Sequence, residues 1–163
     1  MKRKMIIGID PDIDKSGVCV LYPDTRQVQT TCASFHSLLK LLENYSLSEN
    51  EQVTVVVEAS WMYHKTTNWH LNFRDSKNVI AAKGYNVGQN HQTGILICEM
   101  ARSYGLNVVE HIPLIKCWKG HDRKITDKEI KQFMPIVGRT NQESRDAALL
   151  AWIYAGLPVR VKT

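Results

Sequence analysis

Four acidic residues hold positions from which their carboxylates could bind metal ions. Asp10 and Glu58 each end an apolar run, and Glu143 and Asp146 stand three residues apart in a stretch with a helical pattern. Residues three apart lie on one helix face, and continuous apolar runs are typical of central strands that are buried on both sides. A carboxylate at the end of such a strand is costly to bury unless it is paired or binds a metal. We therefore expect the four acids to form a divalent-metal site that cuts phosphodiesters.

Each of these acids also has an ordinary structural explanation. Asp10 could cap the turn that follows it, and Glu58 could be a surface residue at a strand end. Residues 140–143 match a capping-box pattern, and acids favour helix N-termini in any case. Asp146, however, is followed by small and apolar residues, which indicates a closely packed helix face where a charge needs a partner.

The elements that must position these acids follow a mixed α/β pattern. Strands are expected over residues 5–10, 18–22, 27–31, 53–58 and 107–110. Helices are expected from Ser34, from about Gln89 to Tyr104, from Thr126 to about Phe133, and from about Asn141 to Gly156. We interpret residues 61–86 as an irregular functional loop whose aromatic and histidine residues include Tyr63, His64, Trp69, His70 and Phe73. The pattern predicts a single domain over 1–163, a central five-stranded mixed sheet with helices on both faces.

Composition narrows the class of protein. The net charge is +5, and it rises to +9 when the four acids are set aside as neutralised by cations. A basic surface around an acidic pocket suits a protein that holds a polyanion. The four cysteines form no C-x-x-C pair, which predicts reduced thiols in the cytoplasm. The apolar run behind the basic N-terminus stops at Asp10, so we expect neither a signal peptide nor a membrane span.

Basic and aromatic residues near the acids are candidates for nucleic-acid contacts. Five basic residues of the segment 116–139 are candidate phosphate contacts, namely Lys116, Lys119, Arg123, Lys124 and Lys128. Any one of these lysines, taken alone, would more often be an ordinary solvated side chain. Trp61 lies three residues beyond Glu58 and could stack on an unpaired base, although a core position is the alternative.

Several motifs, in this order, resemble those of RuvC-type Holliday-junction resolvases in the ribonuclease H-like superfamily, and the resemblance covers nearly the whole chain. The motifs are Ile7–Pro11 with Ser16–Gly17, Val57–Glu58 with Trp61, Val87–Gln89 before Gly94, Lys116 before Gly120, Lys128, and Glu143–Ala148. Two departures are that Glu143 stands where bacterial enzymes usually have Asp and that Asp12 stands where they usually have Gly. The segment between Trp61 and Val87 also looks longer, as in divergent phage or mobile-element members.

The resemblance implies a ribonuclease H-like fold and a role for each matched residue. The family's metal-binding acids fall on Asp10, Glu58, Glu143 and Asp146, its base-contacting aromatic falls on Trp61, and its DNA-contacting lysines fall on Lys116 and Lys128. It implies a homodimer that uses two Mg²⁺ ions in each active site, for which Mn²⁺ substitutes, and that cuts four-way DNA junctions to leave 5′-phosphate and 3′-hydroxyl ends. No nucleotide cofactor and no membrane partner are expected.

Three other functions remain open at this point. The chain could be a related nuclease that acts on flaps, other branched DNA or RNA, or a catalytically idle DNA-binding protein of the same fold. Sugar-kinase and chaperone-type ATPases also begin with a hydrophobic strand, a glycine and an aspartate. Their two lobes need far more than 163 residues, so the length argues against them.

Overall fold

One mixed sheet of five strands forms the centre of the protein. The computed structural model describes residues 2–62 and 74–161. The strands are β1 (Arg3–Asp10), β2 (Ser16–Tyr22), β3 (Gln27–Ala33), β4 (Glu51–Glu58) and β5 (Asn107–His111). Their order is β3-β2-β1-β4-β5, in which β2 runs antiparallel to β1 and β3 while β4 runs parallel to β1 and β5. The predicted mixed five-stranded sheet is confirmed.

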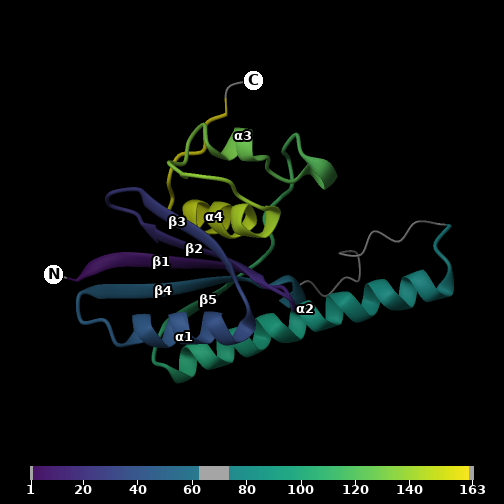
Figure 1. Cartoon of the computed structure of the whole chain (residues 1–163), viewed down its shortest axis with the longest axis horizontal. Coiled ribbons are helices and arrows are strands. Elements are labelled where there is room, and N and C mark those ends of the chain that lie inside the picture. The colour runs from purple at the N-terminus through teal and green to yellow at the C-terminus, as the bar shows by residue number, and fades with distance from the viewer. Residues whose placement is uncertain (1, 63–73, 162–163) are drawn as a thin grey trace.

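Helices cover both faces of the sheet (Figure 1). The helices α1 (Phe35–Ser46) and α2 (Lys77–Ser103) lie on one face, and α3 (Asp127–Ile130) and α4 (Gln142–Tyr154) lie on the other. Successive residues of a strand point to opposite faces, so β1 contributes Ile7 and Ile9 to the core under α1 and α2, and Ile6 to the core under α4. Short 3₁₀ turns occur at Ser60–Met62 and His121–Arg123.

The ends of two helices agree with their sequence signals. Ser34 accepts a hydrogen bond from the backbone N–H of Ser37 and so caps α1. Gly105 follows the C-terminal end of α2 and has a φ of 80°, which only glycine adopts without strain. Both positions were predicted from the sequence.

The first half of α2 was not predicted. This helix begins at Lys77, with Ser76 as its cap, and not near Gln89. Its buried residues all lie at position 93 or later, because the preceding turns extend past the sheet (Figure 1). Residues 77–88 therefore lack the apolar stripe that identifies a helix in sequence, and Gly84 and Gly88 lower its helix propensity further. No helix within the described residues has the length and apolar content to cross a membrane.

The two helices on the α4 side differ from the prediction in detail. The capping box of Thr126 and Glu129 is present as expected, but α3 ends at Ile130 and continues only as turns. The capping box of α4 pairs Asn141 with Ser144, which leaves Glu143 out of it. The capping-box explanation of Glu143 through Thr140 is therefore wrong, although Glu143 does lie in the first turn of α4, where acids are favoured.

Candidate active site

Asp10 and Glu58 lie next to each other at the ends of two parallel central strands. Ile9 of β1 is the register partner of Val57 of β4, and the two acids follow directly. Ile9 and Val57 both pack into the core under α1 and α2. By the alternation of a strand, Asp10 and Glu58 must point to the opposite face, towards α4. The strands thus bring together two carboxylates that are 48 positions apart in the chain.

The helix α4 packs directly on the strands through small residues. A Cβ atom added to Gly8 would overlap the carbonyl oxygen of Ala147 and would lie 2.9 Å from the Cβ of Ala151. A Cβ atom added to Gly17, the register partner of Asp10, would overlap the backbone of Glu143. We call Gly8, Gly17, Ala147 and Ala151 the small-residue interface. It holds the first turns of α4 against the end of β1 that carries Asp10.

Three of the four predicted acids line one cavity. Asp10, Glu58 and Asp146 share what we call the acid cavity, whose remaining lining is mostly apolar side chains and two lysines. Its other lining residues are Leu114, Ile115, Lys116, Trp118, Lys124, Ile125 and Leu149. Glu143 does not line this cavity, but its charge reaches Asp10 and contributes to the pKa of that carboxyl group. The structure therefore places all four acids in one electrostatic cluster.

Burial and mutual repulsion disfavour the charged forms of the two strand-end acids. Burial is the main reason that the pKa of Asp10 lies well above its usual value, and the charges of Glu58 and Asp146 raise it further. The pKa of Glu58 is raised by burial first and by Asp146 second, while Lys124 and Lys116 oppose the shift. Carboxylates that repel each other in this way either take up protons or bind cations.

Lys124 provides a cation inside the acid cavity. Its Nζ lies 2.8 Å from Oδ2 of Asp146, and the two side chains are only 31% and 18% exposed. Burial alone would lower the pKa of Lys124, but the hydrogen bond and charge of Asp146, together with Asp10 and Glu143, raise it overall. Gln142 donates to the other oxygen of Asp146 at 2.7 Å. Both oxygens of Asp146 therefore already have protein partners.

The acids have the right chemistry for a divalent cation but are not arranged as a finished binding site. Carboxylate oxygens are the ligands that Mg²⁺ takes from proteins. Within residues 2–62 and 74–161, however, no three Asp, Glu, His or Cys side chains are placed to hold one ion together. The Lys124–Asp146 pair also places a positive charge inside the cluster, which would repel a divalent cation. Binding a metal here requires local side-chain movement.

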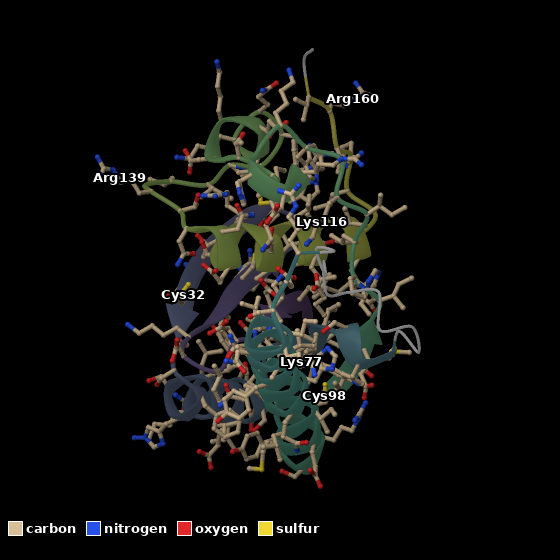
Figure 2. The ribbon with its side chains drawn as sticks, turned by 90° about the vertical axis from the view of Figure 1, so that its right-hand side faces the viewer. Cys32, Lys77, Cys98, Lys116, Arg139 and Arg160 are labelled. Atoms are coloured by element: carbon tan, nitrogen blue, oxygen red, sulfur yellow. The ribbon has the colours of Figure 1, made fainter. Side chains whose placement is uncertain are left out.

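A wider groove adjoins the acid cavity and carries part of the predicted basic set. Asp10 and Glu58 line this groove together with Lys116 and Arg123. In Figure 2, Lys116 lies near α4, whereas Arg139 and Arg160 project from the outer parts of the molecule. The side chains of Lys119 and Lys128 are exposed, and neither residue lines the acid cavity or the groove. Lys116, Lys124 and Arg123 thus lie beside the acids. Lys119 and Lys128 do not line either hollow that contains the acids.

The opposite wall of the groove was missed by the sequence analysis. It is formed by one face of α2 that includes Val87, Asn90 and His91. The Asn90 side chain accepts from the backbone N–H of Ile13 at 3.0 Å and donates to Asp12 at 3.3 Å, which fixes the loop after Asp10. Asn90 and His91 fall inside the helix that was predicted from about Gln89, but nothing in the local sequence marks them as residues of a groove.

Trp61 lies beside the groove, packed against α2. Its ring fills the space next to Gly94 and makes an edge contact with His91, and its indole N–H donates to Glu110 at 3.2 Å. It belongs to the partly buried residues around the core under α1 and α2. Neither the acid cavity nor the groove has Trp61 in its lining. The aromatic segment 63–73 lies outside the described residues.

Comparisons with known proteins identify structures of similar fold. No family model and no curated protein sequence matches the chain. The chain is similar to T. thermophilus RuvC in complex with a Holliday junction substrate, at 14% identity and a TM-score of 0.48, over 93% of this chain and 92% of the other. It is also similar to a second Thermus thermophilus RuvC structure, at 14% identity and a TM-score of 0.44, over 93% and 96%. These are structures of the protein that the sequence motifs resemble, and the likeness concerns the fold.

Proposed function

We propose that the chain is a divalent-metal-dependent nuclease that hydrolyses phosphodiesters in branched DNA, with four-way junctions as the main substrate. The observation that carries this proposal is the convergence of Asp10, Glu58 and Asp146 on one cavity, with Glu143 close enough to act on Asp10. Buried carboxylates with raised pKa values are unfavourable in a purely structural role. A bound cation would relieve their repulsion.

The residues divide into those that hold metal and those that hold DNA. Asp10, Glu58, Glu143 and Asp146 would hold Mg²⁺, two ions in each site with Mn²⁺ as a substitute. Ions held there would provide an activated water and charge stabilisation for the leaving 3′ oxygen, and the products would carry 5′-phosphate and 3′-hydroxyl ends. The DNA phosphates would be bound mainly by the basic residues that line the groove beside the acids.

The remaining predicted contacts belong to the same proposal. Lys116 and Arg123 would bind phosphates next to the acids, while Lys119 and Lys128 would act farther out as parts of the basic surface. Trp61 would reach a base only at the rim of the groove, because one side of its ring packs against α2. A symmetric junction has two strands to cut, so a homodimer is the expected assembly. A location in the cytoplasm, where free cysteines such as these four stay reduced, is part of the same proposal.

One observation favours a second function. The Lys124–Asp146 pair neutralises part of the cluster without a metal, as would suit a catalytically idle DNA-binding protein of this fold. Flap, branched-DNA and RNA substrates also remain within reach of the same chemistry, because phosphodiester hydrolysis at a carboxylate site does not depend on the shape of the nucleic acid.

One experiment separates these functions. Four-way junction, flap, linear duplex and RNA substrates are incubated with the protein at several Mg²⁺ concentrations, beside an Asp10→Asn variant and an Asp24→Asn control in the exposed turn before β3. We expect cutting that requires Mg²⁺, prefers the junction and is lost only in Asp10→Asn, while this variant still binds the junction. Junction binding without cutting at any Mg²⁺ or Mn²⁺ concentration would establish the idle function instead.

A further inference from the structure

The amine of Lys124 occupies the acidic cluster where a cation would be most stable. Besides its contact with Asp146, it is attracted by the charges of Asp10 and Glu143. It lines the acid cavity together with the carboxylates of Asp10 and Glu58. Of the five basic residues predicted to contact DNA, all of which lie in the described part of the chain, only Lys124 forms an ion pair with an acid of the site. Its place is that of a counter-ion.

A compact loop holds Lys124 in this position. Backbone hydrogen bonds join Trp118 N–H to Arg123 O and Gly120 N–H to Lys124 O, each at 3.0 Å. Asp122 and Arg123 have φ values of 52° and 59°, a left-handed conformation that is unfavourable for residues with side chains. Two consecutive residues of this kind indicate that the surrounding contacts determine the path of the loop. The loop therefore delivers Lys124 to the cavity by its backbone geometry and not by the reach of a flexible side chain alone.

A divalent cation and the Lys124 amine compete for the negative charge of Asp146. Asp146 uses Oδ2 for Lys124 and Oδ1 for Gln142. Each carboxylate oxygen has two lone-pair sites, so a single hydrogen bond does not block it, but a divalent cation that ligates Asp146 repels the ammonium group beside it. The amide of Gln142 is uncharged and is held by Arg145, which donates to it at 2.9 Å, so a cation does not expel it, whereas the ammonium group is positively charged and has only donors. Lys124 is thus the partner that has to leave.

We propose that Lys124 is a tethered counter-ion that keeps the metal-free site neutralised and is exchanged for the divalent cation when the metal binds. The displaced amine then faces the groove next to Lys116, where a DNA phosphate can take the place of Asp146 as its partner. This inference rests on the proposed metal site and adds a regulatory step to it: metal affinity is set by an exchange of cations, and the exchange releases a phosphate-binding group.

Calorimetric titration with Mg²⁺ and Mn²⁺ tests the exchange without any DNA. Lys124→Met removes the competing charge and should tighten metal binding about fivefold, as expected for a partly exposed ion pair. Lys131→Met is the matched control, because Lys131 forms a similar pair with Asp127 at 2.7 Å, with side chains 33% and 42% exposed, and lies outside the acid cavity. The control should bind metal like the wild type. Equal or weaker metal binding by Lys124→Met would overturn the proposal.

A second measurement uses the wild-type protein and does not depend on the folding of a variant. The rate at which an acylating reagent modifies each lysine is followed by mass spectrometry, with and without Mg²⁺. Lys124 should react severalfold faster when the metal is present, and Lys131 should not change. An unchanged rate for Lys124 at a saturating metal concentration would refute the exchange.

The two proposals fail in different ways. Tighter metal binding by Lys124→Met in a protein that cuts none of the four nucleic-acid substrates would support the counter-ion and refute the nuclease. Metal-dependent cutting with metal affinity unaffected by Lys124→Met would support the nuclease and refute the counter-ion.

Discussion

Replacing Gly8 by alanine tests whether contact between sheet and helix determines the geometry of the acids. The added Cβ would lie 2.9 Å from the Cβ of Ala151, and ordinary contact begins at 3.4 Å. The helix α4 must therefore retreat by at least 0.5 Å, and farther to clear the carbonyl oxygen of Ala147. Overpacking of this kind costs about 3 kcal/mol at the upper end of its range. Alanine recovers about 1 kcal/mol of backbone entropy, which leaves a net loss of about 2 kcal/mol.

Thermal unfolding measures this loss as a decrease in Tm of about 4–8 °C for a domain of this size. Metal binding should weaken as well, because the retreat of α4 moves Asp146 away from Asp10. Gly88→Ala is the control: a Cβ there meets no atom within 4 Å, so it should stabilise α2 by about 0.5–1 kcal/mol. A Gly8→Ala protein with the Tm and metal affinity of the wild type would show that the helix is not held by this contact.

Three further predictions concern the site residues. Since the pKa of folded Asp10 is raised by burial and by Glu58, its proton stabilises the fold, and stability falls as the pH rises from the unfolded value through the folded one. Asp10→Asn should therefore raise the Tm in metal-free buffer at pH 8 but not at pH 4; equal shifts at both would contradict this. Trp61→Ala should lower stability by roughly 3–5 kcal/mol in chemical denaturation if Trp61 acts as a core residue, whereas slower junction cutting with normal stability would indicate base stacking. Lys116→Ala should weaken binding to all junctions similarly and reduce the salt slope by about one, and a change confined to sequence preference would exclude a phosphate contact.

The sheet and three of the acids were predictable because short-range patterns determine them. The apolar runs that end at Asp10 and Glu58 could be buried only as central strands, and their alternation then aims both carboxylates at one face. The small residues after Asp146 indicated close packing of the last helix, and the structure confirms it with Ala147 and Ala151 against Gly8.

What escaped prediction depends on contacts between distant segments. The first half of α2 buries no side chain of its own, so no apolar periodicity marked it as a helix. Lys124 was grouped with the DNA-binding residues because its sequence neighbours are basic, and nothing local shows that the loop turns it towards Asp146, 22 positions away. The same holds for Asn90, whose partners Asp12 and Ile13 lie more than 75 positions earlier.

The small-residue interface is needed for the packing of the fold, whereas the acids are not, so the two can be lost independently in evolution. A descendant that lost Asp10 would keep its fold, because that carboxylate adds repulsion and not packing. A descendant that gained a side chain at Gly8 would lose stability whatever its activity. Distant relatives should therefore be easier to trace by glycine at positions 8 and 17 and alanine at 147 and 151 than by their acids. Such tracing would recover relatives with and without the four acids, and an activity assay on both groups would then test the role proposed for the acids.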